Sequence, residues 1–321
     1  MKKGHRDEAR NHWRVTDMKT NSTVVTAADE RFAWGAFLLA ASMRRNGMHA
    51  PLVVGAVGWG DAWKARVAAL PDVTVVDLPV SRRCVTCQKP MMMAREEVKT
   101  DWVVWADSDA VFVGDCSEWL AGTDKNEIVV RPYDPPPSDF TPANLAVWRQ
   151  DIARFRGAAC EKPRIGTRVN GAFVVLPAAR RDFAASWQDQ IEKVLPSDVE
   201  IIMSHGSAYF QTDESVLASL LAFDPSAPSV SPDYKADGRV DPARYFAHLA
   251  FNPKPWVMWN SRTVRWADEI FAVVDWLVAN GYVPASEVPC ALRRRWFPLY
   301  RILTPLAPWV WRTMKAWRRL V

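Results

Sequence analysis

Short apolar runs alternate with helical segments over the first hundred residues, and this alternation constrains the fold more than any other feature. Runs rich in β-branched residues cover 22–28, 51–55, 73–77 and 102–106. Segments typical of helices cover 30–46, 61–70 and 90–99. Strands that alternate with helices form a parallel sheet with helices on both faces. We therefore expect an α/β, Rossmann-like fold with a mostly parallel sheet flanked by helices, which binds its ligands at the carboxyl ends of the strands.

The alternation loosens in the second half of the chain. We expect strands over 127–131 and 169–176, and helices over 182–194, 213–221 and 263–279. Residues 132–168 contain three consecutive prolines and a helical stretch over 143–156, which indicates an insertion over the sheet.

The positive charge of the chain is concentrated at its C-terminus. Residues 291–321 hold eight of the 41 basic residues and no acidic one, so 33 basic residues face 36 acidic ones in residues 1–290. A nearly neutral body argues against nucleic-acid binding, which needs a basic face.

The same C-terminal segment is rich in tryptophan. A basic amphipathic helix with tryptophans is typical of a segment that lies in an anionic headgroup layer. The alternative is a helix that docks on the body with solvated arginines. We expect a flexible N-terminus over 1–20, a main domain over 21–285 and a membrane-associating tail over 286–321.

The cysteines and apolar runs indicate the compartment. Five sparse cysteines form no disulfide framework, which favours a reducing compartment, and Cys84 and Cys87 are expected to be loop cysteines. The N-terminus lacks the apolar core of a signal peptide. The longest apolar run, residues 32–43, is shorter than the roughly 20 residues that span a bilayer. We expect a cytoplasmic protein that associates peripherally with the inner face of the membrane.

Asp107 and Asp109 follow directly after the buried run 102–106. In an extended chain, residues two apart face the same way, so both carboxylates reach one edge of the sheet. Two like charges held this close repel unless a cation lies between them or a proton is shared. The pattern predicts a site for Mn²⁺ or Mg²⁺; a solvated strand end is the structural alternative.

His248 and the segment Lys254-Pro255-Trp256 add a second group of candidate residues. An imidazole beside two carboxylates favours Mn²⁺ over Mg²⁺. The ammonium of Lys254 suits a phosphate, and Pro255 stiffens the loop that carries it. A cation with a nearby lysine can hold a diphosphate, which suggests a nucleotide-sugar enzyme.

These motifs resemble the metal-dependent glycosyltransferases of the GT-A fold, over about residues 22–260. The nearest group is the mostly retaining one that includes glycogenin and bacterial lipopolysaccharide galactosyl- and glucosyltransferases. The segments that carry the resemblance are Ala27-Ala28-Asp29-Glu30, Asp107-Ser108-Asp109, Asn170-Gly171, Asp213-Glu214 and His248 with Lys254-Pro255-Trp256. Residues 101–110 are also similar to fungal and plant galactosyl- and xylosyltransferases.

Two residues depart from the pattern of this group. Phe251 occupies a position where the group has glycine, and Glu214 occupies one where it has glutamine. The basic residue that the group carries before its acidic motif corresponds to Lys89 or Arg95.

The resemblance implies a hexosyltransferase that uses a nucleoside-diphosphate sugar, with UDP as the expected nucleotide, and retains configuration. The acceptor would be a cell-envelope glycan, such as lipopolysaccharide, or a lipid-linked sugar. Asp107, Asp109 and His248 would hold Mn²⁺ or Mg²⁺, and Asp213 and Glu214 would be the catalytic carboxylates. The donor would contact Ala27, Asp29, Lys89, Asp107, Asn170, Gly171 and Lys254.

Two other functions fit parts of the pattern. Asp107-Ser108-Asp109 after a strand also resembles the haloacid dehalogenase phosphatases, in which the first aspartate would be a nucleophile. A non-catalytic sugar-binding protein of the same fold is the second alternative.

Overall fold

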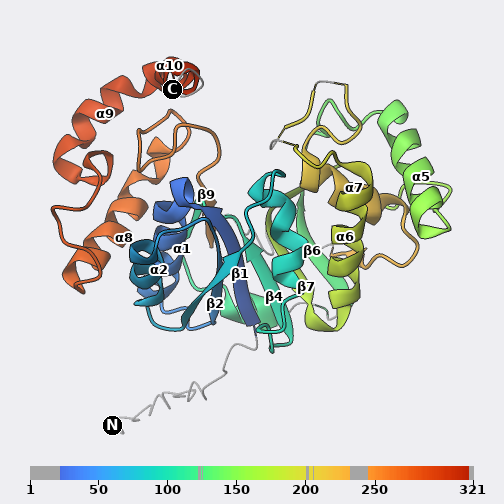
Figure 1. Ribbon diagram of the computed structural model, residues 1–321, viewed down its shortest axis with the longest axis horizontal. Helices are drawn as coiled ribbons and strands as arrows, with labels where there is room; N and C mark the ends of the chain where they lie inside the picture. The colour runs from blue at the N-terminus through green and yellow to red at the C-terminus, as the bar shows by residue number, and fades with distance from the viewer. Residues whose placement is uncertain are drawn as a thin grey trace, which may run out of the picture.

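The strand–helix alternation builds a central seven-stranded sheet, shown in the computed structural model of Figure 1. The structure describes residues 22–121, 124, 126–199, 202–204, 206–231 and 245–317. The predicted N-terminus, 1–20, lies outside these ranges. The strands are β1 (Ser22–Asp29), β2 (Leu52–Val57), β3 (Val73–Leu78), β4 (Trp102–Ala106), β6 (Glu127–Pro132), β7 (Val169–Pro177) and β8 (Ser229–Val230).

The sheet has the order β3-β2-β1-β4-β7-β6-β8 and is mostly parallel. β1 pairs in parallel with β2 and β4, and β2 pairs in parallel with β3. β7 runs antiparallel to both of its neighbours, β4 and β6, and the other described strand pairs of this sheet are parallel, so the predicted mostly parallel sheet is confirmed. β7 is antiparallel because it returns beside β6 after the insertion instead of crossing over the sheet.

Both faces of the sheet are covered, and the two-residue period of the strands divides the core accordingly. Val24 and Val104 pack into one cluster, with α1 (Ala33–Arg45), α2 (Asp61–Ala68) and α8 (Ala267–Ala279). Val25 and Trp105 pack into the other, with α3 (Lys89–Met93), α5 (Pro142–Arg156), α6 (Arg181–Val194) and α7 (Thr212–Phe223). Each fully buried side chain of this kind contributes about 1.5–3 kcal/mol. The predicted α/β fold is confirmed.

The ends of the helices follow local chemistry and packing. α5 begins after Thr141, whose hydroxyl accepts from the amide of Asn144, and it ends at Gly157, whose φ of 83° suits glycine. The predicted helix over 90–99 is wrong, because α3 ends at Met93. The chain turns there so that Val98 can be completely buried ahead of β4.

The five cysteines are all free. Cys84 and Cys87 lie side by side, with their sulfur atoms 3.4 Å apart. The hydrogen bond with Cys87 lowers the pKa of the Cys84 thiol to about 7.

A small second sheet stands beside the main one. It pairs β5 (Ala110–Phe112) antiparallel with β9 (Phe246–His248), so that Ala110 lies opposite His248. α4 (Ser117–Ala121) follows β5.

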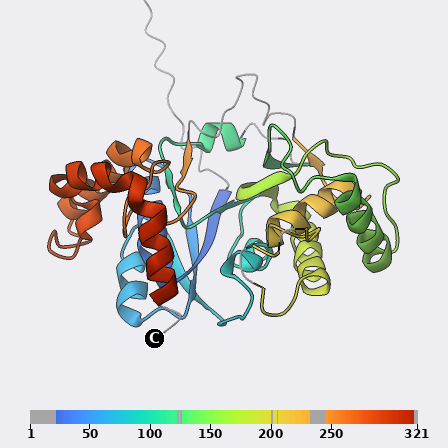
Figure 2. The same ribbon diagram turned by 90° about the horizontal axis from the view of Figure 1, so that it is seen from above.

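The C-terminal helices extend along the side of α8, opposite to the side that carries α5 (Figures 1 and 2). The start of the predicted tail is packed on the main domain: Ala291 and Leu292 are buried, and the ring of Phe297 packs against Trp259 and Phe271. α9 (Phe297–Leu303) and α10 (Ala307–Trp317) follow. Within the described ranges, no helix is long and apolar enough to cross a membrane.

Candidate metal and sugar-nucleotide site

Asp107 and Asp109 lie in the turn between β4 and β5, at the carboxyl end of a central strand. The backbone fixes the turn on both sides: the amide of Asp107 donates to the carbonyl of Ala172 (2.8 Å), and the amide of Leu249 donates to the carbonyl of Asp109 (2.8 Å). Because β5 pairs with β9, the turn faces His248. Two segments about 140 residues apart in sequence therefore meet at one edge of the sheet.

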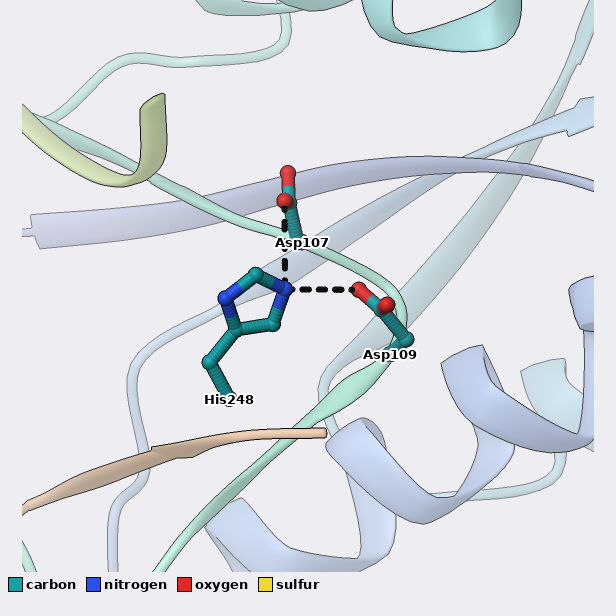
Figure 3. A group of neighbouring side chains, drawn as sticks. All are labelled: Asp107, Asp109 and His248. Carbon is teal, nitrogen blue, oxygen red and sulfur yellow. Dashed lines mark ion pairs between the residues drawn. The ribbon is translucent and has the colours of Figure 1, made fainter. Parts of the chain in front are cut away.

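The three side chains converge on a common point (Figure 3). The Nε2 atom of His248 lies 3.7 Å from an oxygen of Asp107 and 3.4 Å from an oxygen of Asp109. Ligand atoms of all three lie within 4.8 Å of one another. The donor set of two carboxylates and one imidazole fits Mn²⁺ or Mg²⁺. The sequence predicted this convergence correctly.

The second oxygen of each carboxylate is held by the protein. Oδ1 of Asp107 accepts from the indole of Trp105 (2.7 Å) and lies 3.1 Å from Nζ of Lys89. Oδ2 of Asp109 contacts the ammonium of Lys254. Each aspartate thus uses one oxygen for anchoring and directs the other toward His248, an arrangement that orients metal ligands.

The charges of this cluster shift the pKa values of His248 and Asp109 in opposite directions. Burial opposes the charged form of His248, but Asp109 and then Asp107 outweigh it and raise its pKa. Burial likewise opposes ionisation of Asp109, yet Lys254 and His248 hold its pKa well below the ordinary value. These shifts favour a proton on the imidazole beside the two carboxylates, and a metal ion bound there would displace that proton.

Lys89 connects the acidic turn to α7. Its Nζ atom lies 3.1 Å from both Asp107 and Asp213 and donates to the carbonyl of Gly171 (3.0 Å). Burial opposes its charge, but Asp107, Asp213 and Glu214 raise its pKa above the ordinary value. Arg95, the alternative at the sequence level, pairs with Glu97 instead.

Glu214 is held by three hydrogen bonds and one ion pair. One carboxylate oxygen accepts from the hydroxyl of Tyr133 (3.0 Å) and lies 3.2 Å from Arg168. The other accepts from the amide of Gly171 (2.9 Å) and the side chain of Asn170 (3.2 Å). Burial raises its pKa despite Arg168. The predicted residues Asn170, Gly171, Asp213 and Glu214 therefore lie together, linked to Asp107 through Lys89.

Two predicted donor-binding residues lie at the end of β1, outside this network. The carboxylate of Asp29 accepts from the backbone amide of Arg31 (3.0 Å) and pairs with its guanidinium (2.5 Å). Ala27 is buried in the core of the sheet. Among the described residues, neither Ala27 nor Asp29 forms a hydrogen bond or an ion pair with Asp107, Asp109 or His248.

Lys254 was expected to face a phosphate of the donor, but in the structure it contacts a carboxylate. Its ammonium contacts Asp109 and donates to the carbonyl of Leu249 (3.1 Å), and its side chain is only 8% exposed. Trp256 anchors the loop by donating to the carbonyl of Arg31 (3.2 Å). Phe251 keeps a φ of 75°, the left-handed conformation that glycine favours, and points its ring outward.

Several residues of the site were not found from the sequence. Gly35 of α1 lets the acidic turn approach: a Cβ there would clash with the carbonyl oxygen of Ser108 and lie 2.6 Å from the ring of Trp256. Trp105 could have been found from its position two residues before Asp107 on a strand. Arg168 and Tyr133 lie in the insertion, where no motif or periodicity points to them.

The architecture defines the fold. The mostly parallel seven-stranded sheet flanked by helices is the GT-A fold, which solved glycosyltransferases share.

Solved structures supply the particular neighbours. The chain matches an active-site mutant of the galactosyltransferase LgtC, with a TM-score of 0.54 and 16% identity, over 82% of this chain and 98% of that one. It also matches the apo structure of WbbM, a bifunctional glycosyltransferase, with a TM-score of 0.50 and 15% identity, over 79% of this chain and 49% of that one. At this identity the likeness shows the fold. No family model and no curated protein match the sequence.

Proposed function

We propose that the protein is a metal-dependent glycosyltransferase. It would transfer a hexose from a nucleoside-diphosphate sugar, with UDP as the nucleotide, to a cell-envelope glycan or lipid-linked acceptor. The observation that carries the proposal is the convergence of Asp107, Asp109 and His248 at the carboxyl edge of a GT-A sheet. Retention of configuration is part of the proposal and follows the sequence resemblance.

The residues of the site have separate tasks in this proposal. Asp107, Asp109 and His248 would hold Mn²⁺ or Mg²⁺, which neutralises the charge that develops on a departing diphosphate. Lys89 keeps Asp107 and Asp213 in place as a buried cation shared by two carboxylates. Asp213 and Glu214 provide negative charge beside the sugar, where an oxocarbenium-like transition state needs it. Because Glu214 already accepts three hydrogen bonds and pairs with Arg168, it fixes the strand at Asn170 and Gly171 and does not attack the sugar.

Ala27, Asp29 and the end of β1 would contact the nucleoside. Their place at the carboxyl edge of the strand next to β4 supports this, since ligands of such sheets bind there. The phosphatase alternative finds no support, because the chain has the fold of glycosyltransferases and Asp107 is held by Trp105 and Lys89.

The experiment is a hydrolysis assay with a panel of UDP-sugars, with and without Mn²⁺. We expect slow hydrolysis of at least one donor that requires the metal, and its loss in Asp109→Asn. The exposed pair Arg95 and Glu97 offers the control Glu97→Gln, which should leave the rate unchanged. Metal-dependent donor binding without turnover, across a panel of acceptors, would instead indicate a sugar-binding protein.

We also propose that α9 and α10 rest on an anionic membrane surface at the cytoplasmic face. Five large apolar side chains of this segment are 43–75% exposed: Trp296, Leu299, Ile302, Leu306 and Trp309. Exposed basic residues of the same segment are Arg295, Arg301 and Arg312, whereas Arg294 pairs with Asp275 of α8. Each cation near anionic lipid contributes about 1 kcal/mol, and the apolar side chains add their burial. Lys315 and residues 318–321, also assigned to this surface from the sequence, lie outside the described side chains.

Substitutions test this surface better than deletion, because residues 291 and 292 belong to the core. Ile302→Ser combined with Trp309→Ser should reduce binding to vesicles of anionic phospholipid and leave thermal stability unchanged. Undiminished sedimentation with such vesicles would rule this surface out.

A further inference from the structure

The two lysines expected to bind the donor are engaged with carboxylates. Lys254 contacts Asp109, and Lys89 lies between Asp107 and Asp213; their side chains are 8% and 4% exposed. Neither presents a free ammonium to a ligand. A phosphate near the metal-binding residues therefore needs another cation.

Exposed cations line a cavity beside the metal-binding residues. The cavity has a volume of about 380 Å³, and its wall includes His248, Phe251, Arg262 and Arg265. Both arginines are exposed, and neither forms an ion pair with a carboxylate in the part of the chain that the structure describes. His248 belongs to both the cavity and the metal-binding cluster, so the arginine-lined cavity adjoins that cluster.

Arg262 is held in place for binding. Its guanidinium carbon lies 3.7 Å from the centre of the Phe251 ring, which is 53% exposed. A guanidinium stacked on a ring keeps its N–H edge free, where it can bind two oxygens of a phosphate. The side chain of Asn260 accepts from the amides of Arg262 (2.9 Å) and Thr263 (3.0 Å) and so fixes the turn.

The backbone of Phe251 indicates that the stacking of Arg262 on its ring has a function beyond packing. Its φ of 75° is uncommon for a residue with a side chain, and such strain concentrates at functional sites. The strain places an aromatic ring in solvent, where it gains little from burial but supports the guanidinium of Arg262.

We propose that Phe251, Arg262 and Arg265 form an anion subsite that binds a phosphoryl group of a substrate, beside the metal ion. This proposal rests on the proposed glycosyl transfer for the identity of the substrate. The phosphoryl group belongs either to the diphosphate of the donor or to a phosphorylated acceptor; both present the same chemistry to the two arginines.

Calorimetric titration of the full chain tests the subsite. The ligands are UDP with Mn²⁺, uridine as the phosphate-free probe, and inorganic phosphate added to the protein saturated with Mn²⁺ and UDP. The variants are the double substitution Arg262→Gln and Arg265→Gln, Phe251→Leu, and Arg149→Gln as a control at an exposed arginine of α5. Circular dichroism confirms that each variant is folded.

If the donor supplies the phosphoryl group, the double variant binds UDP at least tenfold more weakly, uridine binding is unchanged, and Phe251→Leu loses severalfold. If the acceptor supplies it, UDP affinity is unchanged, and inorganic phosphate binds the wild type and the control but not the double variant. Wild-type affinity of the double variant for both UDP and phosphate overturns the subsite. The variant Asp109→Asn tests the proposed function separately from the subsite. UDP binding that needs neither Mn²⁺ nor Asp109 would contradict metal-dependent glycosyl transfer. In that case the titration with inorganic phosphate would still test the two arginines.

Discussion

Replacing Lys89 by methionine tests how the site is held together. The variant keeps the volume of the side chain and removes the buried cation that lies 3.1 Å from both Asp107 and Asp213. Removing one partner of a buried ion pair costs about 3–5 kcal/mol, because the remaining charges stay buried without compensation. At about 2 °C per kcal/mol, the low end of the usual range that suits a domain of this size, this corresponds to a melting temperature lower by roughly 6–10 °C.

The matched control lies on the same segment. Arg95 pairs with Glu97 at the surface, where an ion pair contributes about 0.2–1 kcal/mol. Urea denaturation of Lys89→Met, Arg95→Met and the wild type gives the comparison. Destabilisation of Lys89→Met by no more than that of Arg95→Met would refute the bridging role of Lys89.

The stability difference between the wild type and Lys89→Met should depend on pH in a defined direction. Burial opposes the charge of Lys89, yet Asp107 and Asp213 raise its pKa above the ordinary value. Its stabilising contribution is therefore fully present below the pKa of an unfolded lysine, about 10.4, and is lost only as pH rises through the folded pKa. The stability difference between wild type and Lys89→Met should be constant from pH 6 to 9 and shrink above that range. A difference that already declines between pH 6 and 8 would point to another group.

Three further predictions concern other parts of the molecule. Gly35→Ala should weaken Mn²⁺ binding more than tenfold, because its Cβ would displace the backbone of Ser108 between the two aspartates; equal metal affinity in a titration would contradict the close approach. Cys84 should react with iodoacetamide with a midpoint near pH 7, since the thiolate is the reactive form, and a midpoint above pH 8 would contradict the hydrogen bond with Cys87. Cys116, whose pKa burial raises to about 12, should remain unmodified by mass spectrometry under the same conditions.

The sequence predicted the parts of the fold that local patterns encode. The structure contains β1 and β4 at the buried runs that end near Asp29 and Asp107. β2, β3 and the helices that connect the strands lie between them, as predicted. One departure arose from tertiary context: the helix predicted over 90–99 is cut short by the burial of Val98. Which strand of the mostly parallel sheet runs antiparallel could not be assigned, because pairing partners leave little trace in a single strand.

The cluster of Asp107, Asp109 and His248 could be predicted because motif and strand end coincide at Asp107 and Asp109. Their supporting partners could not. Arg168 and Tyr133 reach Glu214 from an insertion, and Gly35 acts through the space that it leaves free. The contacts of Lys254 were also beyond sequence reasoning, because a motif lysine can face a phosphate or a carboxylate equally well.

The central claim is that Asp107, Asp109 and His248 bind one divalent ion together with a nucleoside diphosphate. Electron paramagnetic resonance of Mn²⁺ in the presence of UDP measures this directly, with nitrogen modulation reporting an imidazole ligand. The account predicts one bound ion per chain with a nitrogen signal that disappears in His248→Ala, and loss of binding in Asp109→Asn. Stoichiometric Mn²⁺ binding with the same spectrum in wild type and His248→Ala would contradict it.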